Sequence, residues 1–274
     1  MDDPPQMPDE FTQRHARLMR LCCSLRDTGF HEWGFVIYRG VYGDDDAWNS
    51  FVQCLRDNVH LDLVRGAPAH SSAQRGALLE KYAQWTVIED SAALDGASRD
   101  DVRQRFVAWR EGRIVRRPAA RFPMPGDPST ILPRFTYCLY VDYECLATLG
   151  PHLAAKPSDI SQPHRPPPPL VVVLIDGDYV PGQVAQEPFS PIDHFLTRYL
   201  GLHASTPVLG QDAEGPFPPV DGSTARYLGW EYFNTRYLCS LYDSLHVSTL
   251  DGYNYQRPPL IAPGGGVSRS MPSV

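Results

Sequence analysis

Apolar residues recur along the chain at helical spacing in three stretches. From Asp9 to Gly29 they return on one face, and they follow the helical i, i+3, i+4, i+7 pattern closely over residues 44–59. A third stretch begins with a serine cap at Ser98 and a carboxylate at Asp101, followed by an apolar face. We therefore predict a helix in each of these stretches.

Other stretches are typical of strands. Residues 33–39 (WGFVIYR) are aromatic and β-branched, and alternation places Phe35, Ile37 and Arg39 on one face. The segment RFTYCLYVDYECLATL opens as a second strand and then turns into a short helix. Residues 170–176 (LVVVLID) are apolar on both faces, which indicates a strand inside a covered sheet.

Two longer-range expectations complete the outline. Residues 151–169 form a polar, proline-rich connector without a clear helix, so the strands on either side should be antiparallel. A long aromatic helix is predicted over residues 224–247. The expected fold is α+β: a small mixed or antiparallel sheet covered by helices, with a ferredoxin-like core carrying insertions as one topology. One domain should span 9–260, between disordered ends at 1–8 and 261–274.

Charge and motifs narrow the function classes. The net charge is −7 with a pI near 5.7, and no Lys/Arg-rich stripe is present, which argues against a nucleic-acid or membrane partner. No secretory signal or apolar run of membrane-spanning length is visible, so a soluble, cytoplasmic protein is expected. The six cysteines lack metal-ligand spacing, and Walker A, GxGxxG and HExxH motifs are missing. We therefore predict no metal site and no cofactor.

Charged residues at strand ends are the first candidates for chemistry. Arg39 ends the first strand and, if buried, needs a carboxylate from the protein or from a ligand; an aspartate of its own turn is the alternative. Asp142 ends the second strand and Asp176 the third, so the three residues could form one charged cluster if the strands are neighbours. The three aspartates of GDDD at 43–46 are explained by helix capping.

Further candidates are a histidine and several aromatic residues. His194, in PIDHF, is a candidate for acid/base work, although a lone histidine is more often structural. The aromatic residues of the predicted long helix could form core, line an apolar pocket or cover a partner surface. The residues expected to contact a ligand are Tyr42, Tyr140, Trp230 and Tyr237.

Four short blocks resemble a group of filamentous-fungal proteins without an assigned activity: EWGFVIYRGVYGDDDAWNSF, RFTYCLYVDYECLATL, LVVVLIDGDY and YQRPPLI. The resemblance implies a fungal, soluble, intracellular protein and transfers no catalytic residues. Members of such groups sometimes lie beside secondary-metabolite genes.

Two functional hypotheses follow. The first is a protein that binds an apolar small molecule, as a cofactor-independent enzyme of fungal secondary metabolism acting on a polyketide- or terpenoid-like ligand. In it, an arginine–carboxylate cluster and tyrosines would do acid/base or orienting work. The second is a non-catalytic protein–protein interaction module that uses the aromatic helix and the proline-rich connector.

Overall fold

The computed structural model describes residues 7–12, 16–28, 32–64, 70–113, 132–155, 167–181, 217–252, 255–263 and 270–271. Six strands form one sheet in the order β2-β1-β3-β4-β5-β6. The strands are β1 (Val36–Arg39), β2 (Thr86–Ile88), β3 (Tyr137–Val141), β4 (Val171–Asp176), β5 (Trp230–Asn234) and β6 (Ile261–Ala262). The described helices are η1 (Asp9–Thr12), α1 (Met19–Thr28), α2 (Asp45–Val64), α3 (His70–Tyr82), α4 (Ser91–Leu94), α5 (Arg99–Gly112), α6 (Pro133–Thr136), α7 (Tyr143–Ala147), α8 (Leu149–Ala154), η4 (Thr235–Tyr237) and α10 (Leu238–Ser244).

The sheet is mixed, as the α+β expectation allowed. β1 runs parallel to both β2 and β3, whereas β4 is antiparallel to β3 and β5. The antiparallel pairing of the second and third predicted strands is therefore confirmed. A ferredoxin-like core is not confirmed, because three neighbouring strands of this sheet run in the same direction.

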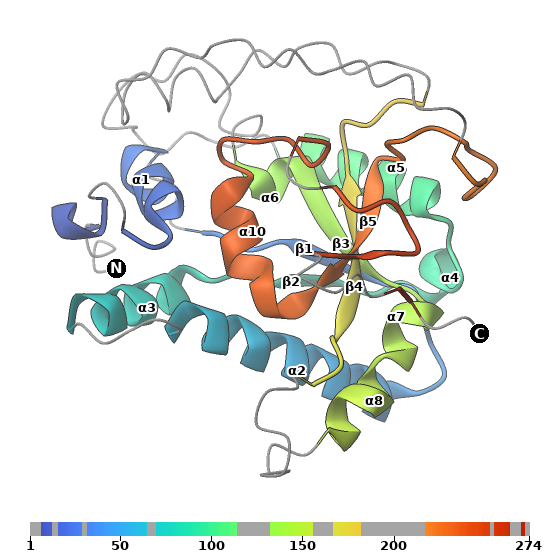
Figure 1. Cartoon of the computed structure of the whole chain (residues 1–274), viewed down its shortest axis with the longest axis horizontal. Coiled ribbons are helices and arrows are strands. Elements are labelled where there is room, and N and C mark those ends of the chain that lie inside the picture. The colour runs from blue at the N-terminus through green and yellow to red at the C-terminus, as the bar shows by residue number, and fades with distance from the viewer. Residues whose placement is uncertain are drawn as a thin grey trace.

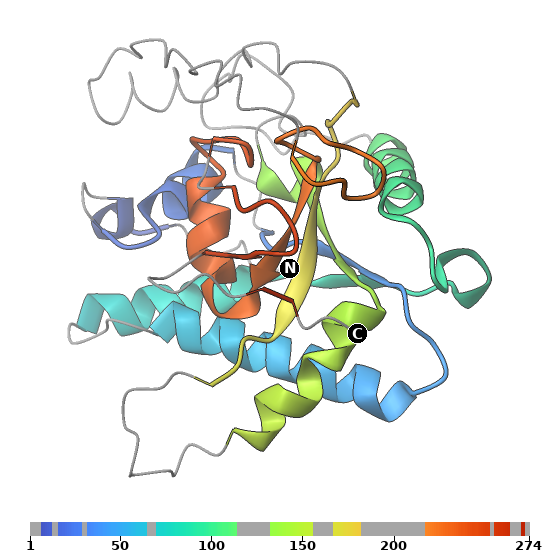
Figure 2. The ribbon, with the colours of Figure 1, turned by 45° about the vertical axis from the view of Figure 1, so that its right-hand side comes forward.

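Helices cover both faces of the sheet (Figures 1 and 2). α10 lies on one face, where Tyr242 packs edge-on against Phe35 of the segment leading into β1. α5 lies on the opposite side in Figure 2, and its Phe106 is fully buried. The strand residues are buried on both faces of β1, β3 and most of β4, which explains their nearly continuous apolar sequences.

Two predicted helix starts are confirmed in detail. The Asp44 carboxylate accepts a hydrogen bond from the Ala47 N–H at 2.8 Å, at the start of α2. Ser98 caps α5, and its side chain and the Asp101 side chain each accept from the other residue's backbone N–H. These contacts satisfy N–H groups that a helix start leaves without intrahelical partners.

The predicted long helix over 224–247 is wrong. This stretch instead contains β5, the short η4 turn and α10. In β5 the aromatic residues Trp230 and Tyr232 alternate with Glu231 and Phe233, and all four are buried in a strand that lies between β4 and β6. Aromatic side chains suit a covered strand as well as a helix, and pairing with β4 decides between them.

Two predicted boundaries also shift. The N-terminal helix is interrupted: η1 ends at Thr12 and α1 begins at Met19, after Leu18 adopts a left-handed backbone conformation with φ of 57°. At the other end, β6 extends the ordered sheet into the stretch expected to be disordered from residue 261. Its pairing with β5 supplies the hydrogen bonds that a short terminal strand needs.

Candidate functional site

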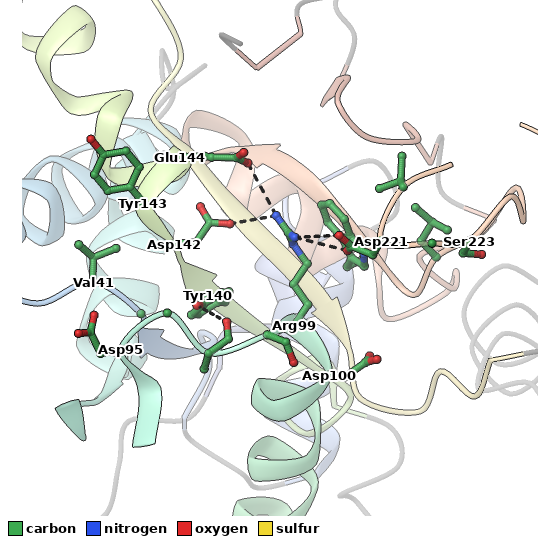
Figure 3. A pocket seen from close by; sticks show the side chains of 18 of the residues that line it. Val41, Asp95, Arg99, Asp100, Tyr140, Asp142, Tyr143, Glu144, Asp221 and Ser223 are labelled. Carbon is green, nitrogen blue, oxygen red and sulfur yellow. Dashed lines mark hydrogen bonds and ion pairs between the residues drawn. The ribbon is translucent and has the colours of Figure 1, made fainter. Parts of the chain in front are cut away.

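An open cleft of about 1180 Å³ lies beside the end of the sheet where β1 and β3 finish (Figure 3). Its walls come from segments far apart in the sequence. They are residues 40–42 after β1, 95–100 from the turn after α4 into the start of α5, Tyr140 and 142–144 around the end of β3, and 220–223, with Tyr179, Pro181, Leu228 and Trp230. Ligand sites in proteins with parallel strands commonly lie at such strand ends.

Close backbone packing builds one wall of the cleft. A Cβ atom on Gly40 would lie 2.2 Å from the Tyr140 ring, so only glycine allows the two to meet. The Gly96 N–H donates to the Gly40 carbonyl at 3.0 Å, which ties the turn after α4 to the end of β1. Tyr140 donates its hydroxyl to the Ala97 carbonyl at 2.7 Å. This hydrogen bond anchors the start of α5 on β3.

Arg99 is the central charged group of the cleft. It is the first residue of α5, directly after the Ser98 cap. Its guanidinium lies 3.9 Å from the centre of the Trp230 ring, and its Nη2 donates to the Tyr232 hydroxyl at 2.9 Å. This cation–π contact and the hydrogen bond hold Arg99 against β5.

Three carboxylates surround the same guanidinium. Asp142 lies 3.1 Å from Arg99 Nη2, and Glu144 lies 3.8 Å from it. Asp221, from the turn on the other side, lies 3.4 Å from Nη1. Tyr232 donates its hydroxyl to Glu144, a carboxylate that is about half exposed to solvent. A series of hydrogen bonds therefore runs from Arg99 through Tyr232 to Glu144.

The environment shifts the pKa values of these groups. Burial alone would lower the pKa of Arg99, but Tyr232, Asp142 and Asp221 outweigh it and raise the pKa. Burial raises the pKa of Tyr232 well above its ordinary value, against the lowering effect of Arg99. Burial, with Asp142 nearby, raises the pKa of Tyr140 to about 12. At neutral pH the cleft therefore holds a charged arginine and neutral tyrosines.

Arg39 finds its partner within its own turn, which was the alternative to a ligand. Its side chain is 6% exposed, and its Nη2 lies 2.5 Å from Asp45, with Glu89 at 3.6 Å from Nη1. The guanidinium also stacks over the rings of Tyr42 and Trp48. These contacts satisfy Arg39 internally, and it does not line the cleft.

The charged cluster expected from Arg39, Asp142 and Asp176 does not form. β1 and β3 are neighbours, but Asp176 pairs with Tyr137 at the start of β3, the opposite end of the sheet from Asp142. There Asp176 accepts a hydrogen bond from Tyr227 at 2.7 Å, and burial raises its pKa to about 6. The reason is that β4 runs antiparallel to β3, so its last residue, Asp176, lies at the end of the sheet where β3 begins.

Asp142 serves both local structure and the cleft. One oxygen accepts the Cys145 N–H at 2.8 Å, which caps α7, and the other receives Arg99. No group of three His, Cys, Asp or Glu side chains among the described residues is arranged as a metal site.

The expected ligand-contacting aromatic residues divide into two groups. Tyr42, Tyr140 and Trp230 line the cleft. Tyr237 lies in η4, beyond the far end of β5, and does not line it. His194 lies outside the residues that the structure describes, as do residues 156–166 of the proline-rich connector.

The most important residue of the cleft, Arg99, was missed by the sequence reasoning. It directly follows the Ser98 N-cap, a position where the helix dipole favours acidic side chains, and no local pattern assigns a role to an arginine there. Glu144 and Asp221 carry no sequence signal either, since each contacts Arg99 across a long sequence separation.

Comparisons with known proteins do not extend this picture. No protein-family model matches the chain, and no curated protein or solved structure matches it significantly. Within the described part of the chain, every helix is too short or too polar to cross a bilayer.

Proposed function

We propose that this protein binds a small molecule in the cleft around Arg99. The observation that carries the proposal is the combination of an open cleft of about 1180 Å³ with an aromatic wall and an internally paired arginine. Small-molecule sites are concave, largely apolar and fitted with a few oriented polar groups. Tyr42 and Tyr143 supply accessible aromatic surface, whereas Arg99 and its carboxylates supply the polar groups.

The charged rim favours an amphipathic ligand over a wholly apolar one. A polyketide- or terpenoid-like molecule with polar substituents would place its body on Tyr42 and Tyr143 and its substituents near Arg99. An enzyme of fungal secondary metabolism is one form of this proposal, and the resemblance in the sequence blocks supports it. In that case the hydrogen bonds from Arg99 through Tyr232 to Glu144 would orient a reacting group or pass a proton.

The interaction-module hypothesis receives less support. Of the aromatic residues that suggested a partner surface, Trp230, Tyr232, Phe233 and Tyr242 are buried, and Tyr227 and Tyr237 are partly exposed. Among the described residues, the large exposed apolar side chains are Leu61 and Val64 on α2, Tyr143 on α7, Leu153 on α8 and Val180 after β4. Singly exposed apolar residues are normal on a protein surface.

A blocking variant tests the proposal. Val41 lies in the cleft wall and contributes its carbonyl, not its side chain, to the contact with Arg39. Val41→Trp should project a large ring into the cleft and obstruct it, while leaving that backbone contact intact. Native mass spectrometry of the purified protein after incubation with a small-molecule library should show bound molecules on the wild type and not on Val41→Trp.

The matched control is Val64→Trp, the same substitution at an exposed position at the end of α2. It should bind as the wild type does. Equal binding by all three proteins would place any ligand elsewhere and contradict the proposal.

A further inference from the structure

The charges around the cleft are unbalanced. Five carboxylates line it: Asp95, Asp100, Asp142, Glu144 and Asp221. Arg99 is the cation in this lining, and Arg103, outside it, pairs with Asp100. Among the described residues, two cations against five carboxylates leave three negative charges facing one concave surface, and concave surfaces concentrate the field of such charges.

The cleft also already holds one cation in a defined way. The Arg99 guanidinium lies on the face of Trp230 and is surrounded by Asp142, Glu144 and Asp221. An aromatic face with carboxylates at its edge is the arrangement that proteins use for cationic groups. Arg99 occupies the face of Trp230, so a second cation would meet the carboxylates around Arg99 rather than this ring.

Acceptor capacity remains after Arg99 is paired. Glu144 and Asp221 are about half exposed, and Asp95 is exposed at the end of α4. In Figure 3, Tyr143, Val41 and Asp95 lie on one side of the view, Arg99 and Asp221 on the other, and Asp142 and Glu144 between them. A carboxylate can accept several hydrogen bonds, so Glu144 and Asp221 can receive an ammonium group as well as Arg99.

From this arrangement we infer that the ligand carries a protonated amine on an aromatic or aliphatic body. The ammonium group would lie among Glu144, Asp142 and Asp221, and the body would lie against the accessible rings of Tyr42 and Tyr143 in the cleft lining. An anionic ligand would instead have to displace carboxylates from Arg99 and enter a negatively charged surface. This inference rests on the proposed function, because it names the charge of the ligand that the cleft receives.

Three fluorescent probes that differ in charge test the inference. Dansylcadaverine has an aromatic body and a primary amine, its N-acetyl derivative is neutral, and N-dansyl-6-aminohexanoic acid carries a carboxylate. The dissociation constant of dansylcadaverine, measured by fluorescence anisotropy, should be at least about tenfold lower than that of the acid, as expected for charge-assisted hydrogen bonds. Added salt should reduce this preference.

Carboxylate variants locate the effect. Asp221→Asn and Glu144→Gln should each weaken binding of dansylcadaverine roughly threefold to tenfold, because each removes a partly exposed negative charge. Neither should change binding of the N-acetyl derivative. Asp57→Asn, at an exposed position on α2 away from the cleft, is the matched control and should leave all three constants unchanged.

The outcomes separate the two proposals. If the three probes bind equally well, or the acid binds best, and Val41→Trp abolishes binding, the cleft binds ligands but the inference about charge is wrong. If the probes bind but Val41→Trp has no effect, or if no probe binds, the proposed function and the inference are both overturned.

Discussion

Glu231 is a carboxyl group that the fold holds in a place without water. Its side chain is on β5 and the residue is 0% exposed. One oxygen accepts the Gln256 N–H at 2.9 Å, and the other has no hydrogen-bond partner among the described residues. Burial raises the pKa of Glu231 from 4.5 to about 8, against the lowering effect of that single hydrogen bond. At neutral pH this carboxyl group is therefore protonated.

The raised pKa makes the stability of the fold depend on pH in a defined direction. Between pH 4.5 and about 8 the folded state keeps a proton that the unfolded state has released. The free energy of unfolding therefore falls as the pH rises through this window, and levels off above it. At about 1.36 kcal/mol per pH unit, the difference of about 3.5 pH units corresponds to at most about 5 kcal/mol.

Glu231→Gln tests this reasoning, because glutamine resembles the protonated side chain and does not titrate. Urea unfolding should be measured from pH 5 to pH 8.5 for the wild type and the variant. The variant should lose less stability as the pH rises, so that the difference between the two curves grows by several kcal/mol across the window. Glu111→Gln, an exposed carboxylate on α5, should follow the wild type at every pH.

Parallel curves for Glu231→Gln and the wild type, within about 1 kcal/mol over this range, would refute the reasoning. Such a result would mean that the carboxylate ionises in the folded state near its ordinary pKa. The shifts of other groups do not affect this comparison, because they contribute equally to both proteins.

Two further substitutions test how the cleft is built. Ser98→Ala removes the side-chain cap of α5 and should lower the free energy of unfolding by about 1 kcal/mol in urea titrations; Ser91→Ala, at the exposed start of α4, should have a smaller effect. Gly40→Ala places a methyl group against the Tyr140 ring and should lower the melting temperature, with a cost of about 1–3 kcal/mol. Gly150→Ala, on α8 with open space at its Cβ, should be neutral or slightly stabilising, and equal effects at the two glycines would contradict the packing argument.

The candidate site shows which of its residues local sequence patterns can identify and which they cannot. The sequence indicated Tyr42, Tyr140 and Trp230 as ligand-contacting residues, and all three line the cleft. It did not indicate Arg99, whose partners Asp142 and Asp221 lie 43 and 122 positions away along the chain. Such contacts depend on which strands are neighbours, and residue type at one position carries no information about that.

The sequence was sufficient to predict structure where the hydrogen-bonding and charged groups of a segment find their partners within that same segment. The caps at Asp44 and Ser98, the covered strand β4 and the ion pair of Arg39 with its own turn all follow from residues close together in the sequence. Hydrogen bonds to helix ends and alternation on a strand involve only a few neighbouring residues, so their patterns are visible in the sequence.

Tertiary structure decided the features that depend on pairing. The segment 230–234 is a strand and not part of a helix because β4 and β6 provide its hydrogen bonds on both sides. Asp176 and Asp142 lie at opposite ends of the sheet because β4 runs against β3. The sequence by itself determined where α2 and α5 begin and that β4 is a covered strand. The order and direction of the strands, which bring Arg99 to its carboxylates, required the folded chain, because these contacts join segments that no local pattern connects.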